Sequence, residues 1–329
     1  MMMEPEVEAD VVSKQAPRDL SILIVSYNTR ELTLECIESV IAETKDAPFS
    51  YEILVLDNDS NDGSADAIQR EFGDEPLVKL VRLDHNIGFA DGNNRIAKNA
   101  TGKRLLLLNP DTKILDRGIV KLMECADRHP DAILGGRTYF GDGSFNPTSC
   151  HGWPTLWSVT CMGLGLSTMF RNNRVLDPES LGPWKRDTVR EVPVVTGCFL
   201  LIRWDQWLSL GGFDTTFFMY GEETDLCRRA AQRGIPRMIC PDAKLIHYGG
   251  ASEKVRSDRM VKLFNAKVRF FRKHWSKPAC MYGVAMLKLW AWSRMAGHWG
   301  IRQLGKQTAG YDAWRDIWRR RREFAAEHC

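Results

Sequence analysis

The chain has 329 residues, 44% of them hydrophobic and 26% charged, and a formal net charge of +3. These fractions are those of an ordinary soluble globular protein with a sizeable core, which sets aside fibrous and wholly disordered classes. Residues 1–19 are acidic and polar and contain no apolar core. We therefore expect them to be disordered, and we do not expect them to act as a signal peptide or an anchor.

Charge is distributed unevenly along the chain. Residues 254–329 contain 18 Lys and Arg against 5 Asp and Glu, a net charge of +13, which leaves −10 for residues 1–253. Six of the eleven tryptophans also lie in this last quarter. The asymmetry predicts a separate C-terminal extension with a partner of its own.

The cysteines show no metal-binding or disulfide-framework spacing. Nine are scattered along the chain without a CxxC pair. In a chain of this length, that distribution predicts buried, reduced thiols in a cytosolic compartment.

The first third of the chain alternates predicted strands with predicted helices. Apolar runs predict strands, and apolar residues at helical spacing predict helices. The expected strands are 20–25, 51–56, 77–83 and 104–108, and the expected helices are 31–42, 64–72 and about 91–100. This alternation indicates βαβ units and a mostly parallel, Rossmann-like central sheet flanked by helices, an α/β fold.

The remainder is less regular. We expect a helix over 114–129, strands over 132–135 and 192–203, a helix over 222–233, and short strands over 236–240 and 244–247. Residues 138–190 are rich in Gly, Pro, Ser and Trp, which predicts a long loop over the site. The predicted domains are a catalytic domain over 20–253, with a nucleotide half (20–137) and an acceptor half (190–253), and a helical extension over 254–329.

Polar residues follow three of the predicted parallel strands. They are Ser26-Tyr27-Asn28, Asp57 with its turn, and Asn109-Pro110-Asp111. Ligands of open α/β sheets bind at the carboxyl ends of the strands, so we expect these clusters to converge. Asp111 suits a hard divalent cation that holds a diphosphate, although an Asn-Pro-Asp turn needs no metal. Asp57 suits a ring N–H or a ribose hydroxyl, although its segment also fits a plain surface turn.

Later in the chain, Glu222-Glu223-Thr224-Asp225 opens a predicted helix and His247 ends a predicted strand. Acidic residues at a helix start are favoured by the helix dipole alone, but a carboxylate aimed at a cleft can accept a proton from an alcohol. A single His is more often structural, but one beside the Gly249-Gly250 loop can also ligate a metal.

Seven motifs in this order resemble the family 2 inverting glycosyltransferases of the GT-A fold, and most closely a bacterial rhamnosyltransferase-like branch that builds surface polysaccharides. The resemblance covers roughly residues 20–275. The motifs are the strand ending in Ser26-Tyr27-Asn28, the segments 56–64, 86–94, 108–112 and 211–214, Tyr220-Gly221-Glu222-Glu223-Thr224-Asp225-Leu226, and His247-Tyr248-Gly249-Gly250.

The resemblance implies roles for individual residues. Asp57 would hold a pyrimidine base, and the loop 88–94 would lie along the diphosphate and sugar. Asp111 would bind a divalent cation, Mg²⁺ or Mn²⁺, with His247 as a further ligand. The implied nucleotide-sugar-binding residues are Ser26, Tyr27, Asn28, Asp57, Asn58, Ser60, Gly88, Phe89, Gly92, Asn93 and Asn109.

Two departures from the family pattern affect the expected site. The late acidic pair is usually Glu-Asp, with the second acid as the base; here it is Glu222-Glu223, so Glu223 inherits the role and the choice between the two stays open. Asn109 replaces the first acid of the DxD-type motif. That change is normal in this branch, and it leaves Asp111 as the sole carboxylate of the motif.

The resulting hypothesis is inverting, metal-assisted transfer of a sugar from a nucleoside diphosphate, dTDP- or UDP-linked and with dTDP-rhamnose as one candidate, to a glycan or lipid-linked glycan. One alternative is a nucleotidyltransferase, but that class carries a Gly-rich basic loop where this chain has Ser26-Tyr27-Asn28-Thr29. A second is a non-catalytic, membrane-associated nucleotide-sugar binder.

The basic, Trp-rich extension suits helices that lie on an anionic membrane, which would make the protein peripheral at the inner face of the plasma membrane. The same helices could instead pack on the catalytic core or form a dimer contact. The run Arg319–Arg322 has no accompanying nucleic-acid recognition motif, so we expect no nucleic-acid partner.

Overall fold

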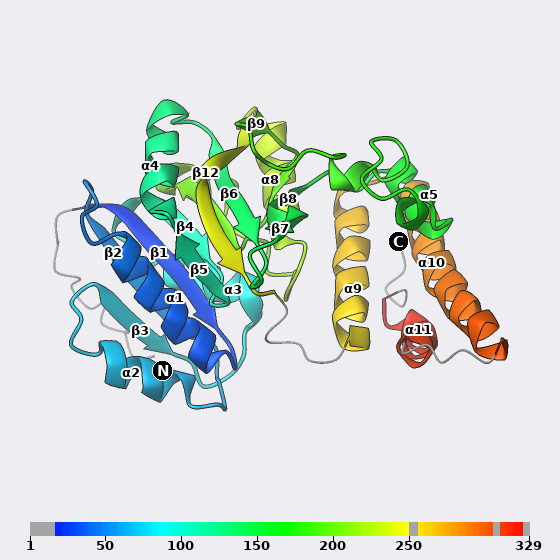
Figure 1. Cartoon of the computed structure of the whole chain (residues 1–329), viewed down its shortest axis with the longest axis horizontal. Coiled ribbons are helices and arrows are strands. Elements are labelled where there is room, and N and C mark those ends of the chain that lie inside the picture. The colour runs from blue at the N-terminus through cyan, green and yellow to red at the C-terminus, as the bar shows by residue number, and fades with distance from the viewer. Residues whose placement is uncertain (1–16, 250–255, 305–309, 325–329) are drawn as a thin grey trace, which may run out of the picture.

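The computed structural model describes residues 17–249, 256–304 and 310–324. Figure 1 shows two parts: a twisted sheet covered by helices, and a lobe of helices that includes α9, α10 and α11. In the first half of the chain the elements are β1 (Arg18–Ser26), α1 (Arg30–Glu43), β2 (Tyr51–Asp57), α2 (Ser64–Phe72), β3 (Val78–Arg82), α3 (Gly88–Ala97), β4 (Gly102–Leu108), β5 (Thr112–Leu115), α4 (Gly118–Arg128), β6 (Ile133–Tyr139), β7 (Phe145–Asn146), β8 (Cys150–His151), α5 (Leu156–Gly163) and α6 (Leu166–Met169).

The second half contains β9 (Arg190–Glu191), β10 (Val194–Val195), β11 (Phe199–Arg203), α7 (Trp204–Leu210), α8 (Glu222–Gln232), β12 (Arg237–His247), α9 (Arg256–His274), α10 (Lys277–Gln303) and α11 (Gly310–Arg319). Three short 3₁₀ helices, Pro147–Ser149, Pro178–Ser180 and Arg320–Arg322, complete the described elements. None of the helices in these ranges is both long enough and apolar enough to cross a membrane.

Within the described residues the main sheet has ten strands, and eight of them follow the order β3-β2-β1-β4-β11-β6-β12-β5. The strands β3, β2, β1 and β4 are parallel, as the alternating strand and helix pattern predicts. β11 runs antiparallel to both β4 and β6, and β12 runs parallel to β6. The carboxyl ends of β1, β2, β4 and β12 therefore lie along the same edge of the sheet.

Both faces of the sheet are covered, which explains why its central strands are continuous apolar runs. One face packs on α1 and α4 through residues such as Ile37 and Leu122. The opposite face packs on α3, α7 and α8 through residues such as Ile96, Trp207 and Leu226. The core thus fixes the strand ends, from which the predicted site residues project.

Three predicted elements differ from the structure. Residues 112–115 form β5, which pairs with 244–247 of β12, so the helix expected from 114 begins only at Gly118. The strand expected over 192–203 is divided into β10 and β11. The two strands expected over 236–247 are one strand, β12, with a register shift between Ile239 and Lys244.

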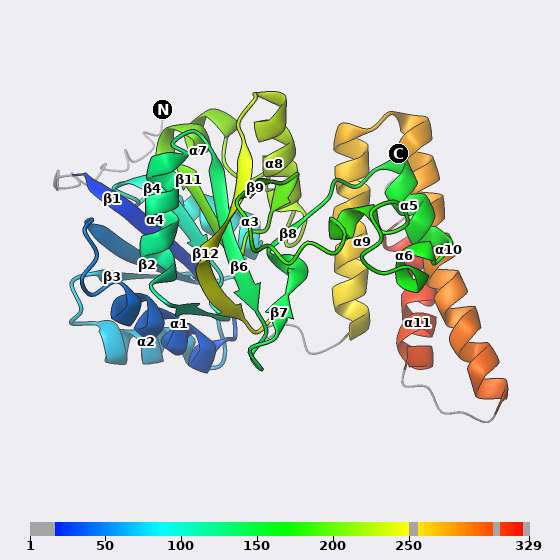
Figure 2. The same cartoon turned by 45° about the horizontal axis from the view of Figure 1, so that its top comes forward.

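The prediction of a long loop over the site for residues 138–190 is wrong. This segment contains α5 and α6, which pack on α10 at the side of the molecule distant from β1–β3 (Figures 1 and 2). The Thr160 and Tyr282 hydroxyls lie 2.6 Å apart and join α5 to α10. The apolar residues of segment 138–190 therefore pack against the C-terminal helices. This contact joins residues far apart in the sequence, so local periodicity does not predict it.

The C-terminal helices have an apolar core of their own. Val159 of α5, Phe271 of α9, Leu287 of α10 and Ile317 of α11 are all buried in it. Residues 250–255, which include the predicted domain boundary at 253, lie outside the described residues.

The prediction that all cysteines are reduced is wrong for three of the described ones, Cys125, Cys240 and Cys280, which are disulfide-bonded. Cys125 of α4 and Cys240 of β12 form a disulfide across 115 residues of sequence. A pairing over that separation leaves no spacing pattern for the sequence to reveal. Five others, Cys36, Cys150, Cys161, Cys198 and Cys227, are free and buried, as expected.

Candidate active site

The turn after β2 brings Asp57 toward the loop after β1. Asp57 is 3% exposed; its Oδ1 accepts a hydrogen bond from the Ser60 N–H at 3.0 Å, and its Oδ2 is buried with no partner. The Ser60 hydroxyl accepts a hydrogen bond from the Asn28 N–H at 2.9 Å. The two turns therefore support each other and hold one carboxylate oxygen available at the sheet edge.

Asn58 positions the loop before α3. Its Nδ2 donates to the Asn86 side chain and the Gly88 carbonyl, and its Oδ1 accepts from the Ile87 N–H. Gly88 has a φ of +85°, and a Cβ there would lie 2.5 Å from the Phe218 carbonyl oxygen. Only glycine fits both the backbone angle and this close approach. Asn58 thus holds the loop that contains Gly88 in place. That loop contacts Phe218, in the segment that leads into α8.

Three of the predicted nucleotide-sugar-binding residues point into the protein. The Ser26 hydroxyl is buried and bonds to the Thr29 and Thr33 hydroxyls. A Cβ on Gly92 would meet Val25 at 3.0 Å, so this glycine permits close packing of α3 on β1. Asn93 donates its Nδ2 to the carbonyl of its own helix at Phe89. The contacts of Ser26, Gly92 and Asn93 in the structure are therefore with other parts of the protein itself.

Asn109, Asp111 and His247 lie together at the same edge. The His247 Nε2 is 3.4 Å from the Asp111 Oδ1 and 3.4 Å from the Asn109 Nδ2. Both separations exceed an ordinary hydrogen bond. Burial disfavours the imidazolium, but the neighbouring Cys198 Sγ and Asp111 carboxylate outweigh it and raise the pKa of His247 to about 11.

This group partly fits a divalent cation. Asp111 supplies one oxygen ligand, and His247 supplies one nitrogen ligand once a cation displaces its proton, because only the neutral imidazole binds a metal. The buried Asn109 Oδ1 and His247 Nδ1 have no partner. Over residues 17–249, 256–304 and 310–324, no group of three or more His, Cys, Asp or Glu could hold a metal by itself. Mg²⁺ is commonly held by one or two carboxylates plus substrate phosphates, so the donor set suits a cation that arrives with a diphosphate.

The acidic pair begins α8, as predicted, but its two members differ in environment. Glu222 is 4% exposed, and burial, with the nearby Glu223 charge, raises the pKa of Glu222 well above its usual value. Glu223 is partly exposed. A Cβ on Gly197 would lie 3.5 Å from the Phe89 ring and 3.9 Å from the Glu223 Cβ, so Gly197, which precedes β11, has both residues as neighbours.

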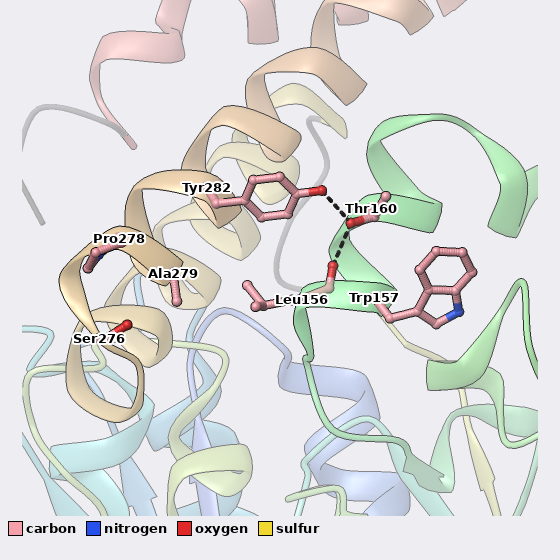
Figure 3. Close-up of a pocket in the computed structure, with 7 residues that line it drawn as sticks. All are labelled: Leu156, Trp157, Thr160, Ser276, Pro278, Ala279 and Tyr282. Atoms are coloured by element: carbon pink, nitrogen blue, oxygen red, sulfur yellow. Dashed lines mark hydrogen bonds between the residues drawn. The ribbon is translucent and has the colours of Figure 1, made fainter.

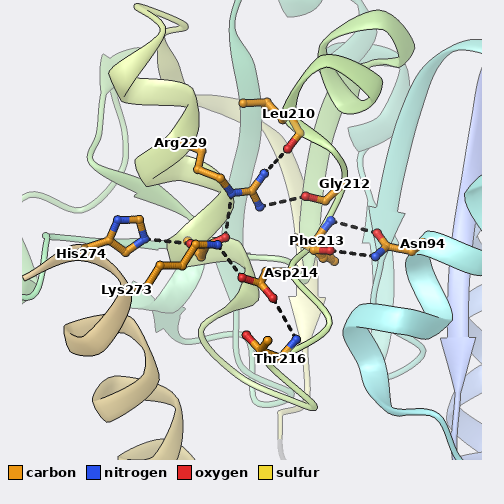
Figure 4. Close-up of polar contacts among 10 residues, drawn as sticks. Asn94, Leu210, Gly212, Phe213, Asp214, Thr216, Arg229, Lys273 and His274 are labelled. Carbon is orange, nitrogen blue, oxygen red and sulfur yellow. Dashed lines mark hydrogen bonds and ion pairs between the residues drawn. The ribbon is translucent and has the colours of Figure 1, made fainter. Parts of the chain in front are cut away.

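Asp225, the third acid of this helix start, is fully occupied. Figure 4 shows Arg229, Lys273 and His274 converging, and the Asp225 carboxylate bonds to all three at 2.8 Å. Burial alone would raise the pKa of Asp225, but His274, Lys273 and Arg229 outweigh it and lower that pKa to about 2. Asp225 therefore joins α8 to α9, and its carboxylate is engaged by three side chains of the protein itself.

In the part of the chain that the structure describes, thirteen buried side-chain nitrogen or oxygen atoms have no hydrogen-bond partner, five of them on predicted site residues and eight elsewhere. Most buried polar side chains in proteins are hydrogen-bonded, so each exception requires an explanation. Within the described residues, buried side-chain oxygens or nitrogens without a partner occur on five of the predicted site residues: Asp57, Asn109, Glu222, Glu223 and His247. A polar ligand at the edge would satisfy such atoms.

The two most evident cavities lie elsewhere. One of about 690 Å³ is formed between α5 and α10 (Figure 3). The second, of about 440 Å³, is polar and lies beside α3, with Asp91 and Arg95 in its lining. Because neither contains a predicted site residue, we locate the candidate site by its polar groups and not by cavity size.

Two residues that contact the candidate site were not predicted. The carbonyl of Cys198 accepts from the Asn109 N–H at 3.1 Å, and the Tyr248 N–H donates to the Asp111 carbonyl at 3.0 Å. The Tyr248 hydroxyl also donates to Glu35 of α1, which pairs with Lys113. For Tyr248, its position beside His247 offered a signal in the sequence. For Cys198 there was none, because its contact with Asn109 depends on the tertiary fold.

Comparison with known proteins agrees with this geometry. Residues 21–179 match the model of the family described as Glycosyl transferase family 2. The match covers just under half of the chain, which is similar to this family of glycosyltransferases over those residues. Some of its curated relatives carry names of the rhamnosyltransferase-like branch. The matched segment includes Asp57 and Asp111, whereas the acidic pair of α8 and His247 lie beyond it.

Three curated relatives illustrate this branch. The chain is 27% identical over 239 residues to "O-antigen biosynthesis protein RfbC" of Myxococcus xanthus, which covers 71% of the chain but 18% of that protein. It is 27% identical over 215 residues to "N-acetylglucosaminyl-diphospho-decaprenol L-rhamnosyltransferase" of Mycobacterium tuberculosis, covering 60% of the chain and 66% of the relative. It is 25% identical to "Rhamnosyltransferase WbbL" of Escherichia coli, and the match covers 69% of the chain and 82% of that relative.

Solved structures support the GT-A fold. The mannosyltransferase PcManGT from Pyrobaculum calidifontis, in complex with GDP-Man and Mn²⁺, has a TM-score of 0.58 at 16% identity and covers 95% of this chain and 89% of its own. GalNAc-T7 with UDP, GalNAc and Mn²⁺ has a TM-score of 0.53 at 15% identity, and the match covers 78% of this chain and 51% of GalNAc-T7. At these identities the likeness establishes the fold alone.

The Asp225 network should be essential for stability. We expect Asp225→Asn to lower the free energy of unfolding by roughly 3 kcal/mol, because the change leaves partly buried cations without their anion. Since its native pKa is about 2, the carboxylate contributes fully above its unfolded value of 3.8 and loses that contribution as the pH falls toward 2. Urea unfolding at pH 7 measures the effect. Asp116→Asn, which removes an exposed partner of Lys244, should have little effect on unfolding because exposed ion pairs are screened by solvent.

The raised pKa of Glu222 predicts a pH-dependent stability. The buried acid favours the neutral form in the folded state, so its contribution is complete below the ordinary value of 4.5 and is lost as the pH rises toward the folded pKa. Glu222→Gln should therefore raise the Tm relative to wild type at pH 8 and change it little at pH 4.5. The exposed Glu124→Gln should show no such trend. Equal shifts at both pH values would contradict a neutral, buried Glu222.

Proposed function

We propose that the protein transfers a sugar from a nucleoside diphosphate to a hydroxyl group of a glycan or lipid-linked glycan, with inversion at the anomeric carbon. The observation that carries the proposal is the set of unsatisfied buried polar atoms on Asp57, Asn109, the acidic pair and His247, all at one sheet edge. Donor and acceptor would supply the missing partners. The match to the model of glycosyl transferase family 2 supports the same reaction class.

The reaction needs a base beside the acceptor. In the proposed step the Glu223 carboxylate takes the proton of the acceptor hydroxyl, and the oxygen forms a bond to the anomeric carbon from the face opposite the diphosphate. The bond from that carbon to the phosphate oxygen breaks, and its electron pair leaves with the diphosphate. A single displacement inverts the configuration, and base catalysis of this kind contributes about 10²–10⁴-fold.

The two acids can be distinguished by their surroundings. Burial and the neighbouring Glu223 charge raise the pKa of Glu222, which favours its neutral form, and a neutral carboxyl group is a poor proton acceptor. Glu223 is partly exposed and neighbours Gly197, whereas Asp225 is held by the side chains of Arg229, Lys273 and His274. These contrasts favour Glu223 as the base and Glu222 as a buried positioning residue.

Asp111 and His247 would hold a divalent cation, Mg²⁺ or Mn²⁺, and Asn109 lies against them. When bound, such a cation stabilises the charge of the departing diphosphate. The unpaired Oδ2 of Asp57 would accept a hydrogen bond from the nucleobase or the ribose of the donor. Tyr27 and Asn28 would lie beside the same nucleoside. The GT-A neighbours that contain Mn²⁺ support the presence of a cation.

The donor and acceptor are proposed from chemistry and from the names of relatives. The chain spans 18% and 66% of the lengths of the Myxococcus and Mycobacterium relatives, so their whole activities are not transferred to it. Two relatives are named as rhamnosyltransferases, and one of these names includes a diphospho-decaprenol. We therefore propose a dTDP- or UDP-linked donor, with dTDP-rhamnose tested first, and an acceptor at the cytoplasmic surface of the membrane.

Glu223→Gln should lower turnover about 10²–10⁴-fold while the donor still binds, because the amide keeps the shape of the side chain but cannot accept a proton. Turnover is measured by release of the nucleoside diphosphate, and donor binding by the donor-induced rise in Tm. Glu222→Gln is the matched control, and we expect it to retain turnover to within about tenfold. Near-normal turnover of the Glu223 variant combined with a large loss in the Glu222 variant would reverse the assignment.

Replacing the proposed cation ligand Asp111 should weaken the binding of the metal by an amount that activity measurements can detect. We expect Asp111→Asn to raise the Mn²⁺ concentration for half-maximal activity by about tenfold or more, because a neutral amide is a weaker ligand for a hard cation. The Mn²⁺-dependent part of the donor-induced Tm shift should fall in parallel. Asp116→Asn, five residues away and outside the cluster, serves as the control. Full wild-type activity in EDTA would rule out the proposed cation.

A further inference from the structure

The outer face of the helical lobe, formed by α5, α6 and α10, exposes large apolar side chains. Between 48% and 74% of the surface is exposed in each of Trp157, Leu164, Met169, Met281, Trp292 and Trp299. Exposed apolar side chains scattered singly are ordinary, but a group gathered on one face marks a site of interaction. None of these residues belongs to the candidate active site.

Direct contacts make α5, α6 and α10 one surface. The Thr160 hydroxyl of α5 meets the Tyr282 hydroxyl of α10 at 2.6 Å, and the Arg294 guanidinium donates to the Thr168 hydroxyl of α6. A Cβ on Gly163 would lie 3.0 Å from the Met286 carbonyl oxygen, so α5 approaches the α10 backbone closely. Segments more than a hundred residues apart in sequence therefore share this face.

The two sides of α10 have different roles. Cys280, Leu287 and Ala291 are buried on the side that packs into the lobe. Met281, Trp292 and Trp299 are separated by 11 and 7 residues, close to whole helical turns, so they form one stripe on the exposed side. The lobe core is complete without this stripe.

An apolar cavity opens on the same face. It has a volume of about 690 Å³ and is lined by Leu156, Trp157, Thr160, Ser276, Pro278, Ala279 and Tyr282 (Figure 3). Trp157 and Tyr282 are aromatic residues with one polar group each, a type enriched where protein meets the interface of a bilayer.

Basic residues predominate on this face. Residues 156–176 and 277–303 contain no Asp or Glu. The basic residues Arg171, Arg174, Lys277 and Arg302 are exposed. The nearby acids are engaged within the protein: Asp177 accepts from the Asn172 N–H, and Glu179 pairs with Lys267. An apolar and aromatic face whose own segments carry only basic charged residues is complementary to a lipid surface with anionic headgroups.

We propose that the outer face of α5, α6 and α10 docks on an anionic bilayer surface, with its Trp, Met and Leu side chains entering the interface and its basic residues contacting the headgroups. The inference rests on the proposed function only in that a membrane-borne acceptor gives the docking a purpose. It assigns half of the surface to residues 156–176, which precede the C-terminal extension in the sequence.

The test is co-sedimentation of the full chain with vesicles of phosphatidylcholine alone and of phosphatidylcholine mixed with phosphatidylglycerol. Wild type should bind the mixed vesicles, and binding should weaken as salt is raised. The variant Leu164→Ser/Met169→Ser/Met281→Ser should lower the partition coefficient about tenfold or more, because three apolar side chains no longer enter hydrocarbon. The control Val189→Ser/Leu208→Ser, exposed apolar residues outside this face, should bind as wild type.

A second pair of variants keeps the proposal testable if the serine variant fails to fold. Arg171→Gln/Lys277→Gln should lower binding to the mixed vesicles about tenfold and flatten its salt dependence. Lys45→Gln/Lys98→Gln, exposed cations on the catalytic part, should have no effect.

Three results would overturn the docking surface: wild type that binds neither vesicle, both outer-face variants binding as wild type, or a wild-type dimer without vesicle affinity that the serine variant converts to a monomer. The last result would identify the face as a contact between copies. The donor-induced Tm shift is measured in the same samples. If that shift persists without vesicle binding, the docking inference alone fails; if vesicle binding persists without the shift, the proposed function fails.

Discussion

The antiparallel pairing of β11 with β4 is the interaction on which the geometry of the candidate site depends. It joins the parallel strands β3, β2, β1 and β4 to the second half of the sheet, in which β6 and β12 again run in the direction of β4. The bond from the Asn109 N–H to the Cys198 carbonyl continues this pairing past the strand ends. His247 consequently reaches the same edge as Asp111, although 136 residues separate them in sequence.

The first turn of α8 shows how neighbouring acids acquire different roles. Successive helical residues point about 100° apart, so Glu222, Glu223 and Asp225 meet different surroundings. Asp225 is bonded to His274, Lys273 and Arg229 and is stabilised as an anion, whereas Glu222 is buried beside the Glu223 charge and favours its neutral form. The positive end of the helix dipole acts on all three and cannot explain this contrast. The difference arises from α9, which supplies His274 and Lys273 to only one of them.

The sequence sufficed where the determining interactions are local. The apolar runs of β1, β2 and β4 and the helix Ser64–Phe72 were predicted closely, because burial on both faces and helical spacing are visible in the residues themselves. The polar clusters at strand ends followed from the parallel topology. The shape of residues 138–190 could not be inferred, because α5 and α6 are stabilised by α10, more than a hundred residues later. β5 was missed for the same reason, since its partner is the distant β12. The disulfide between Cys125 and Cys240 likewise depends on tertiary proximity alone.

The helix α8 connects the candidate site mechanically to the helical lobe. Its first turn carries Glu222 and Glu223 at the sheet edge, and two residues further along Asp225 is bonded to His274 at the end of α9. Because a helix is rigid over one turn, a displacement of α9 must move the acidic pair or break the Asp225 contacts. Arg229 adds a second constraint by donating to the Leu210 and Gly212 carbonyls, which fixes α8 against the turn after α7. A lobe held in this way orients any surface it binds relative to the site, and this fixed orientation is what an enzyme needs if its acceptor is held at an interface.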